Sequence, residues 1–214
     1  MKERTQNFVN SFFERHPDLI CIREPIMKAA ALWTEVLGSG GKILLCGNGG
    51  SCADCDHIAG ELLKGFLLKR PVSTDFREKL AQYGDFGTEI GSKLQHGLPA
   101  ISLCSHSAPI SAFANDVDGD LVFAQQVLAY GNPGDILVGI STSGNSKNVS
   151  AAMMVANAKG LHTMALAGRD GGKIGQLAEI AVIAPEQETY LIQEYHLAIY
   201  HLLCAMVEYE LFEQ

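Results

Sequence analysis

His57 and Glu61 are the two side chains of this sequence best suited to move a proton or to hold a metal ion. They are four residues apart, so in a helix they share one face and reach a common atom. The pair fits either a general base with an orienting partner or two metal ligands. On its own, this spacing is more often an ordinary solvent-exposed contact, so its meaning depends on the segment that precedes it.

A glycine-rich turn precedes this pair. The apolar run 42–46 predicts a buried parallel strand, and Ser51 is the predicted N-cap of a helix over 52–65. Glycine lets the backbone turn tightly and approach a ligand, while the free N–H groups of a helix start attract an anion. We therefore expect Asn48, Gly49 and Ser51 to bind the phosphate and nearby hydroxyl groups of a phosphorylated substrate.

A second loop of the same kind follows another predicted strand, 135–140. It leads into a helix that is predicted to end near Gly160. Hydroxyl and backbone N–H groups at a helix start can surround a phosphate without a lysine. Neither loop has the P-loop pattern or the dinucleotide fingerprint, so a monophosphate ester is favoured over a nucleotide cofactor. The candidate ligands in this loop are Ser141, Thr142, Ser143 and Ser146.

The apolar spacing over 189–212 predicts a long C-terminal helix that carries further candidates. Gln193 and His201 are eight residues apart, which is about 80° around a helix, so both can face one pocket. His196 points about 140° away from His201. We therefore expect a supporting role at most for His196.

Three motifs occur in a characteristic order along the chain. They are the turn at 47–51 followed by Asp54, His57, Glu61 and Leu62, then the loop at 141–146, and then Gln193, Glu194, His196 and His201. Together, over about residues 32–208, they resemble the sugar isomerase (SIS) domain of the phosphoheptose isomerase type. The resemblance implies conversion of sedoheptulose 7-phosphate into D-glycero-D-manno-heptose 7-phosphate by a cytoplasmic homotetramer with sites between subunits.

An aldose–ketose isomerase needs a base, an acid and a group that holds the developing enediolate. With the resemblance, Glu61 is the expected base and His201 the expected acid or its partner, while Asp116 is expected to bind a sugar hydroxyl. Some family members carry a metal, and the corresponding zinc ligands would be His57, Glu61, Gln193 and His201. Bound zinc and acid–base catalysis without a metal are equally open from the sequence.

Predicted strands and helices alternate along the rest of the chain. The strands are expected at 42–46, 100–105, 135–140, 162–167 and 180–184, after N-terminal helices at 6–16 and 24–37. This order predicts an α/β three-layer sandwich, with a five-stranded parallel sheet between layers of helices. The helix at 24–37 has a wide apolar face, expected to pack on the sheet or on another subunit. We expect a single SIS domain over 1–214, with a helical extension at about 1–37 and an insertion at about 70–98 that holds one short helix.

The 214 residues include 16 basic and 24 acidic side chains, a formal charge of −8 that disfavours binding to nucleic acid or membranes. Lys64, Lys69 and Arg70 are nevertheless expected to attract an anionic substrate. No long apolar segment follows the N-terminus, so no signal peptide and a cytoplasmic location are expected. Six scattered cysteines are expected to be reduced thiols, with Cys52 and Cys55 packing as small residues rather than forming a redox or zinc motif.

Two other functions stay open from the sequence. The first is a phosphosugar-binding or protein-interaction module that has the fold without the reaction. A binder would need only the hydroxyl-rich loops, so the presence of His57, Glu61, Gln193 and His201 together favours an enzyme. The second is an isomerase of another sugar phosphate, since the insertion at 70–98 can reshape the mouth of the pocket.

Overall fold

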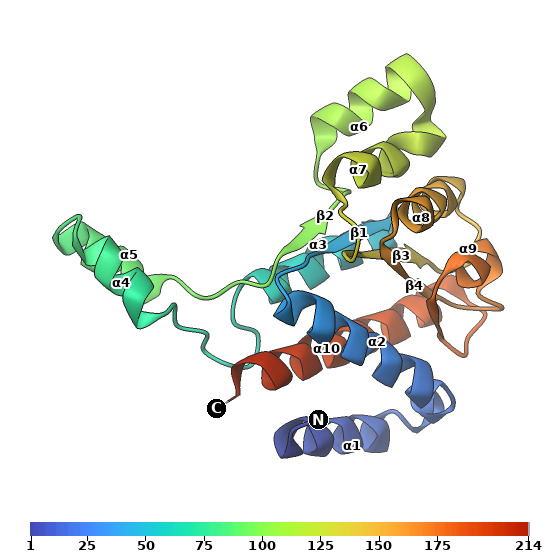
Figure 1. Cartoon of the computed structure of the whole chain (residues 1–214). Coiled ribbons are helices and arrows are strands. Elements are labelled where there is room, and N and C mark those ends of the chain that lie inside the picture. Colours follow the sequence, from blue (N-terminus) through green and yellow to red (C-terminus); the bar gives the residue numbers. More distant parts are fainter. Residues whose placement is uncertain (214) are drawn as a thin grey trace.

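A computed structural model describes residues 1–213, and a parallel sheet of five strands forms the centre of the protein (Figure 1). The strands lie in the order β2-β1-β3-β4-β5. Their bounds are β1 Ile43–Gly47, β2 Ala100–Ser102, β3 Ile136–Ser141, β4 His162–Ala167 and β5 Ile180–Ile183. All five predicted strands are confirmed. Only β2 is clearly shorter than expected, because the Ser105 N–H donates back to the Ser102 carbonyl and turns the chain away.

The strand order creates a topological switch point between β1 and β3. The chain passes from β1 to β2 on one side, and then to β3, β4 and β5 on the other. Gly47 at the end of β1 pairs in register with Ile140 near the end of β3. In open parallel sheets, such a point opens the crevice in which ligands bind. Both predicted phosphate loops directly follow these two strands.

Helices cover both faces of the sheet. Those on one face are α2 Arg23–Gly38, α3 Gly50–Leu63 and α10 Thr189–Phe212, and those on the other are α7 Val122–Tyr130, α8 Lys147–Lys159 and α9 Gly172–Leu177. Successive strand residues point to opposite faces. Ile43 and Leu45 of β1 accordingly pack in the hydrophobic core beneath α2, α3 and α10. Leu44 and Cys46 pack in the core beneath α7, α8 and α9. The predicted three-layer α/β sandwich is confirmed.

Two N-terminal helices, α1 Glu3–Arg15 and the short 3-10 helix η1 Pro17–Ile22, precede α2 and pack on the first of these layers. Phe8 of α1 meets the ring of Tyr209 of α10 edge-on, with 5.5 Å between ring centroids. Trp33 of α2 is fully buried, and α2 contacts α10 and β5. The wide apolar face of α2 therefore packs within the chain.

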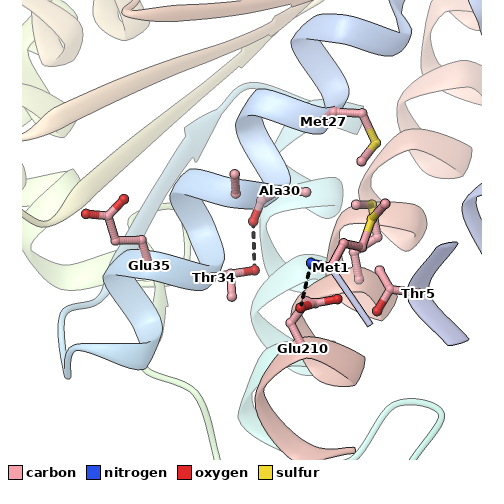
Figure 2. Close-up of a pocket in the computed structure, with 9 residues that line it drawn as sticks. Met1, Thr5, Met27, Ala30, Thr34, Glu35 and Glu210 are labelled. Carbon is pink, nitrogen blue, oxygen red and sulfur yellow. Dashed lines mark hydrogen bonds and ion pairs between the residues drawn. The ribbon is translucent and has the colours of Figure 1, made fainter. Parts of the chain in front are cut away.

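An apolar groove of about 410 Å³ lies between the start of α1, α2 and the end of α10 (Figure 2). In Figure 2, the side chains of Met1 and Met27 project into the space between these helices. The groove is lined by Met1, Thr5, Met27, Ala30, Ala31, Thr34, Glu35, Met206 and Glu210. None of the predicted site residues belongs to this lining, so the candidate chemistry lies elsewhere.

The predicted insertion contains two helices rather than one. They are α4 Thr74–Ala81 and α5 Asp85–Lys93, which pack on each other and project from the body of the protein (Figure 1). The Phe76 N–H donates to Ser73 Oγ, which caps α4, and Gly84 adopts a φ of 80° that starts α5. The expectation of one short helix was wrong because this glycine turn allows a second helix to begin.

The remaining helices lie between β2 and α7. They are α6 Ser107–Phe113, the π-helix η2 Ala114–Asp118 and the 3-10 helix η3 Gly119–Leu121. The long C-terminal helix expected at 189–212 is confirmed as α10. Within residues 1–213, no helix combines the length and apolar character needed to span a membrane.

Candidate active site

The glycine-rich turn starts α3 two residues earlier than expected. Gly49, rather than Ser51, is the N-cap, with a φ of 56° in the region that favours glycine. Ser51 instead lies buried in the first turn, where its N–H donates to the Asn48 carbonyl at 3.0 Å. The predicted cap was wrong because Gly49 already redirects the chain. Asn48, Gly49 and Gly50 are exposed at the helix start, where backbone N–H groups attract an anion.

The two predicted phosphate loops are joined across the switch point. The side-chain amides of Asn48 and Asn148 exchange two hydrogen bonds of 2.9 Å, which link the first loop to the start of α8. In the second loop, Ser141 Oγ lies 3.0 Å from Ser146 Oγ. The structure therefore places donors from both loops around one end of the sheet, as a phosphate site requires.

A polar cavity of about 410 Å³ opens beside the second loop. It is lined by Ser143, Asn145, Arg169, Asp170 and Gln187. Arg169 has a φ of 55°, which is uncommon outside glycine, and its Nε donates to the Gln187 carbonyl at 3.1 Å. The sequence motifs did not indicate Arg169. The sequence feature that could have pointed to Arg169 is the glycine-rich turn after β4, which lies at the same end of the sheet as the other two loops.

Three of the predicted catalytic or metal-binding side chains meet between α3 and α10. His57 Nε2 lies 3.3 Å from Glu61 Oε1 and 3.4 Å from His201 Nε2. The second carboxylate oxygen, Glu61 Oε2, is 3.0 Å from Lys64 Nζ. The side chain of Glu61 is 15% exposed and that of His57 is 42% exposed. The carboxylate is thus largely shielded, while the histidine side of the group is open to a ligand.

Tyr200 holds His57 from the far side of the ring. Its hydroxyl lies 2.9 Å from His57 Nδ1 and 3.4 Å from Asp54 Oδ1. Burial, with the neighbouring Asp54 charge, raises the pKa of Tyr200, so the hydroxyl stays protonated at neutral pH. The motifs did not single out Tyr200, although Gln193 and Tyr200 are seven residues apart and so only about 20° apart around the helix.

Phe66 covers the other histidine. Its ring stacks on that of His201, with centroids 5.5 Å apart and planes 28° apart. Burial and the neighbouring His57 lower the pKa of His201, so its imidazole is mainly neutral at pH 7. A neutral imidazole has one N–H donor and one acceptor nitrogen. His201 is therefore able to give or to take a proton.

Comparison with known proteins places this site in a family. A family model of the SIS domain matches residues 21–80 and 83–168. The phosphoheptose isomerase of Desulfovibrio desulfuricans is 42% identical over 192 residues, which cover 90% of this chain and 78% of that protein. The chain belongs to the phosphoheptose isomerase family of SIS-domain proteins.

Solved structures of the phosphoheptose isomerase family have the same architecture as this chain. The phosphoheptose isomerase of Neisseria gonorrhoeae has a TM-score of 0.73 at 34% identity, over 95% of both chains. That of Francisella tularensis has a TM-score of 0.74 at 30% identity, over 97% of this chain and 98% of that chain. The similarity therefore extends over nearly the whole length of this family member.

Gln193 lies beside the first predicted phosphate loop of this phosphoheptose isomerase fold. A Cβ atom added to Gly50 would sit 2.1 Å from Gln193 Nε2, so the amide packs directly over the start of α3. This close approach requires a glycine at position 50. The structure thus associates Gln193 with the first loop, two turns before His201 on α10.

Asp116 occupies a different region. It is exposed in η2 and accepts a hydrogen bond of 2.9 Å from the adjacent Asn115 side chain. The helix η2 packs against α6 and η3. The expected contact of Asp116 with a sugar hydroxyl stays a prediction.

Two residues of the motifs have structural surroundings. His196 is fully buried, and its Nε2 lies 3.1 Å from the Ala167 carbonyl oxygen, so it links α10 to β4. Arg70 was expected to attract an anionic substrate together with Lys64 and Lys69. That expectation was wrong for Arg70, which is 1% exposed and pairs with Glu208 inside the protein.

The side chains that meet between α3 and α10 are of types that zinc binds. Imidazole nitrogens and a carboxylate oxygen are donors that zinc accepts, and atoms about 2.1 Å from a tetrahedral ion lie about 3.4 Å apart. The spacings of 3.3 and 3.4 Å around His57 Nε2 match that edge length. Within residues 1–213, however, no group of three or more His, Cys, Asp or Glu side chains is arranged to hold a metal ion. The donor types and these two distances therefore suit zinc, but the described residues do not form a complete zinc site.

Proposed function

We propose that this protein is an aldose–ketose isomerase that converts sedoheptulose 7-phosphate into D-glycero-D-manno-heptose 7-phosphate. The observation that carries the proposal is the meeting of Glu61 and His57 of α3, the helix that follows the first loop, with His201 of α10. Relatives in Desulfovibrio desulfuricans and Helicobacter pylori, both named phosphoheptose isomerase, are 42% and 41% identical to this chain. A binding module would not need the acid–base group.

Glu61 acts as the base and His201 as the acid. Glu61 takes a proton from C1 of the ketose while His201 donates a proton to the carbonyl oxygen on C2, which gives an enediol. Loss of the proton on O1 and protonation of C2 then give the aldose, so the atoms balance. Lys64 holds Glu61 Oε2 and leaves Oε1 on the side of His57, which orients the substrate oxygens.

The two loops bind the phosphate and the hydroxyl groups nearest to it. Exposed backbone N–H groups at the start of α3 and the hydroxyl-rich second loop supply donors to an anion. Gln193 adds an amide above Gly50. The substrate ligands in this proposal are Asn48, Gly49, Ser51, Asp116, Ser141, Thr142, Ser143, Ser146 and Gln193.

We propose that a zinc ion binds at the same site and assists the reaction. The alternative is acid–base catalysis without a metal. His57, Glu61, Gln193 and His201 would hold the ion, which would polarise the substrate carbonyl as a Lewis acid. Metal analysis of protein purified without chelators decides between them. About one zinc per chain, lost in His201→Ala, supports the metal; a metal-free protein with full turnover supports acid–base catalysis alone.

An isomerase assay with sedoheptulose 7-phosphate tests the function. Glu61→Gln removes the base, and we expect turnover to fall by about 100-fold or more. Glu24→Gln is the matched control, because Glu24 also pairs with a lysine one turn away, Lys28 at 2.8 Å. A folded wild-type protein that is active only on another sugar phosphate contradicts the proposed substrate. Inactivity on all sugar phosphates, with retained binding, supports the non-catalytic module.

We also infer a homo-oligomer, with a tetramer as the expected state. Large apolar side chains are exposed in and beside the insertion: Leu63, Leu67, Phe76, Tyr83, Phe86 and Leu94. Exposed apolar surface of this kind marks an interaction site. Light scattering after size-exclusion chromatography is expected to give four times the 23.0 kDa of one chain. We place the enzyme in the cytoplasm, because an anionic sugar phosphate does not cross an apolar bilayer unaided.

A further inference from the structure

A fully buried ion pair lies next to the proposed active site and has no part in the proposed mechanism. Arg70 Nε is 2.7 Å from Glu208 Oε1, and both side chains are 0% exposed. Glu208 follows His201 by two turns of α10, so the two residues lie on nearly the same helix face. Burying two charges is costly, and apolar residues of similar size are often as stabilising. Stability alone therefore does not explain the pair.

The ion pair fastens the segment 64–70, which connects α3 to the insertion. The Glu208 carboxylate accepts hydrogen bonds from the backbone N–H groups of Phe66, Leu67 and Leu68, at 2.8, 2.6 and 2.8 Å. Three successive N–H groups on one carboxylate form a tightly defined loop. Glu208 therefore determines where the backbone of this segment lies.

Arg70 connects the same segment to the last turns of α3. Its Nη1 donates to the Leu62 carbonyl at 2.8 Å, and its Nη2 lies 3.5 Å from the carbonyl oxygen of Glu61. Its guanidinium also lies 4.9 Å from the centre of the Phe212 ring at the end of α10. The pair thus locks the loop, the end of α3 and the end of α10 together.

Both proposed proton-transfer groups contact the fastened segment. Phe66 stacks on His201 at 5.5 Å between ring centroids, and Lys64 Nζ lies 3.0 Å from Glu61 Oε2. A shift of the segment would therefore move the ring that covers His201 and the ammonium group that holds Glu61. Displacements of about 1 Å can slow an enzyme by about 100-fold.

We propose that Arg70 and Glu208 are positioning residues for the isomerisation, which act through Phe66 on His201 and through Lys64 on Glu61. This inference rests on the proposed function for its kinetic test. Neither residue touches the substrate. Their effect is expected in kcat, since the substrate-binding loops lie at the other end of α3 and do not contact the pair.

Glu208→Gln is the main test variant, because it keeps the side-chain volume and removes the charge. One amide oxygen then replaces a carboxylate that accepts from three N–H groups and Arg70. We expect kcat to fall by about 10- to 100-fold, while KM changes by less than about threefold. A folded Glu208→Gln enzyme whose kcat stays within about twofold of wild type overturns the proposal.

Asp135→Asn is the matched control. Asp135 is also buried, pairs with Lys42 at 2.6 Å and accepts backbone N–H groups of Lys42 and Asn132 at 3.0 and 2.7 Å. It lies just before β3, and its side-chain hydrogen bonds go to Lys42 and Asn132 rather than to the segment 64–70. We expect this variant to lose stability without the selective loss of kcat. An equal loss of kcat in both variants would show general destabilisation and would contradict positioning.

Phe66→Leu tests the route of the effect and remains informative if Glu208→Gln does not fold. It removes the stacked ring and leaves the ion pair intact. We expect Phe66→Leu to lower kcat at nearly unchanged KM. In the double variant with Glu208→Gln, the fold-loss in kcat should be smaller than the product of the two single fold-losses. A Phe66→Leu enzyme with wild-type kcat, or strictly multiplicative effects, counts against transmission through Phe66.

A separate measurement distinguishes this inference from the proposed function. If the wild-type protein does not turn over sedoheptulose 7-phosphate, the proposed function fails. The positioning is then measured without catalysis, by nuclear Overhauser contacts between the rings of Phe66 and His201 in selectively labelled protein. The contacts are expected in wild type and Asp135→Asn and should be lost in Glu208→Gln. Their persistence in Glu208→Gln overturns the inference.

Discussion

His57 Nε2 faces His201 Nε2 at 3.4 Å, so the two rings present the same kind of atom to each other. Two facing ring nitrogens need a proton or another cation between them, because two lone pairs repel. The tautomer of His57 is set from its other nitrogen, which lies 2.9 Å from the Tyr200 hydroxyl. The proton state of the proposed acid thus depends on a residue outside the sequence motifs.

Tyr200→Phe removes the hydroxyl that orients His57 while keeping the aromatic ring. We expect kcat to fall by about 10- to 100-fold, the usual loss when the partner of a functional histidine is removed. Tyr195→Phe is the control, because Tyr195 lies on the same helix and its hydroxyl donates to Asp18 at 3.3 Å, away from the site. Equal steady-state rates for the two variants would contradict this role of Tyr200.

Gly50→Ala should displace Gln193 without unfolding the protein. The new Cβ atom would sit 2.1 Å from Gln193 Nε2, the flexible end of a side chain that is able to move away. We expect weaker substrate binding, seen as a raised KM, with the melting temperature nearly unchanged. Gly60→Ala on the same helix meets no atom within 4 Å and is expected to stabilise by about 0.5–1 kcal/mol. An unaltered KM in Gly50→Ala would show that Gln193 does not contact substrate.

Deletion of the helical hairpin 74–93, with a short Gly-Ser connection, should leave the body folded. No side chain of α4 is buried, and α5 buries only Gly87 and Gly91. The two ends of the hairpin are already close, because Pro71 and Gln95 form an antiparallel bridge. We expect an unchanged melting temperature and a smaller mass by light scattering. A deletion protein with its full oligomeric mass would exclude the hairpin from the subunit interface.

His196 should make the protein less stable in acid. Burial lowers its pKa from 6.5 to about 4, so between these values the unfolded chain binds more protons than the folded one. The contribution of His196 to the free energy of unfolding is therefore fully present above pH 6.5 and is lost as the pH falls toward 4. The full effect is on the order of 3 kcal/mol, at about 1.4 kcal/mol for each pH unit.

Urea unfolding at several pH values measures this effect. His196→Gln should flatten the dependence of the unfolding free energy on pH between 6.5 and 4. His162→Gln is the control, because the side chain of His162 is 40% exposed and pairs with Glu179 at the surface. If both variants keep the wild-type slope, another group is responsible for the acid sensitivity.

The main elements follow from local sequence patterns. Apolar runs indicate all five strands, and the apolar spacing indicates α10 over Thr189–Phe212 with the bounds that the structure has. The N-cap of α3 was predicted less accurately from the sequence, because Ser51 and Gly49 both suit a helix start. A left-handed φ at Gly49 decided between them. The second helix of the insertion was missed for a similar reason, since its start depends on Gly84.

The sequence by itself determined the order of strands and helices, the two loops predicted to bind an anion and the residue types of the proposed acid–base group, because these depend on short-range spacing and side-chain chemistry. Only the tertiary structure decided the contact of Tyr200 with His57, which are 143 residues apart, and the burial of Arg70 against Glu208, which are 138 apart. Such pairings depend on how whole helices pack, and no local pattern encodes which side chains then meet.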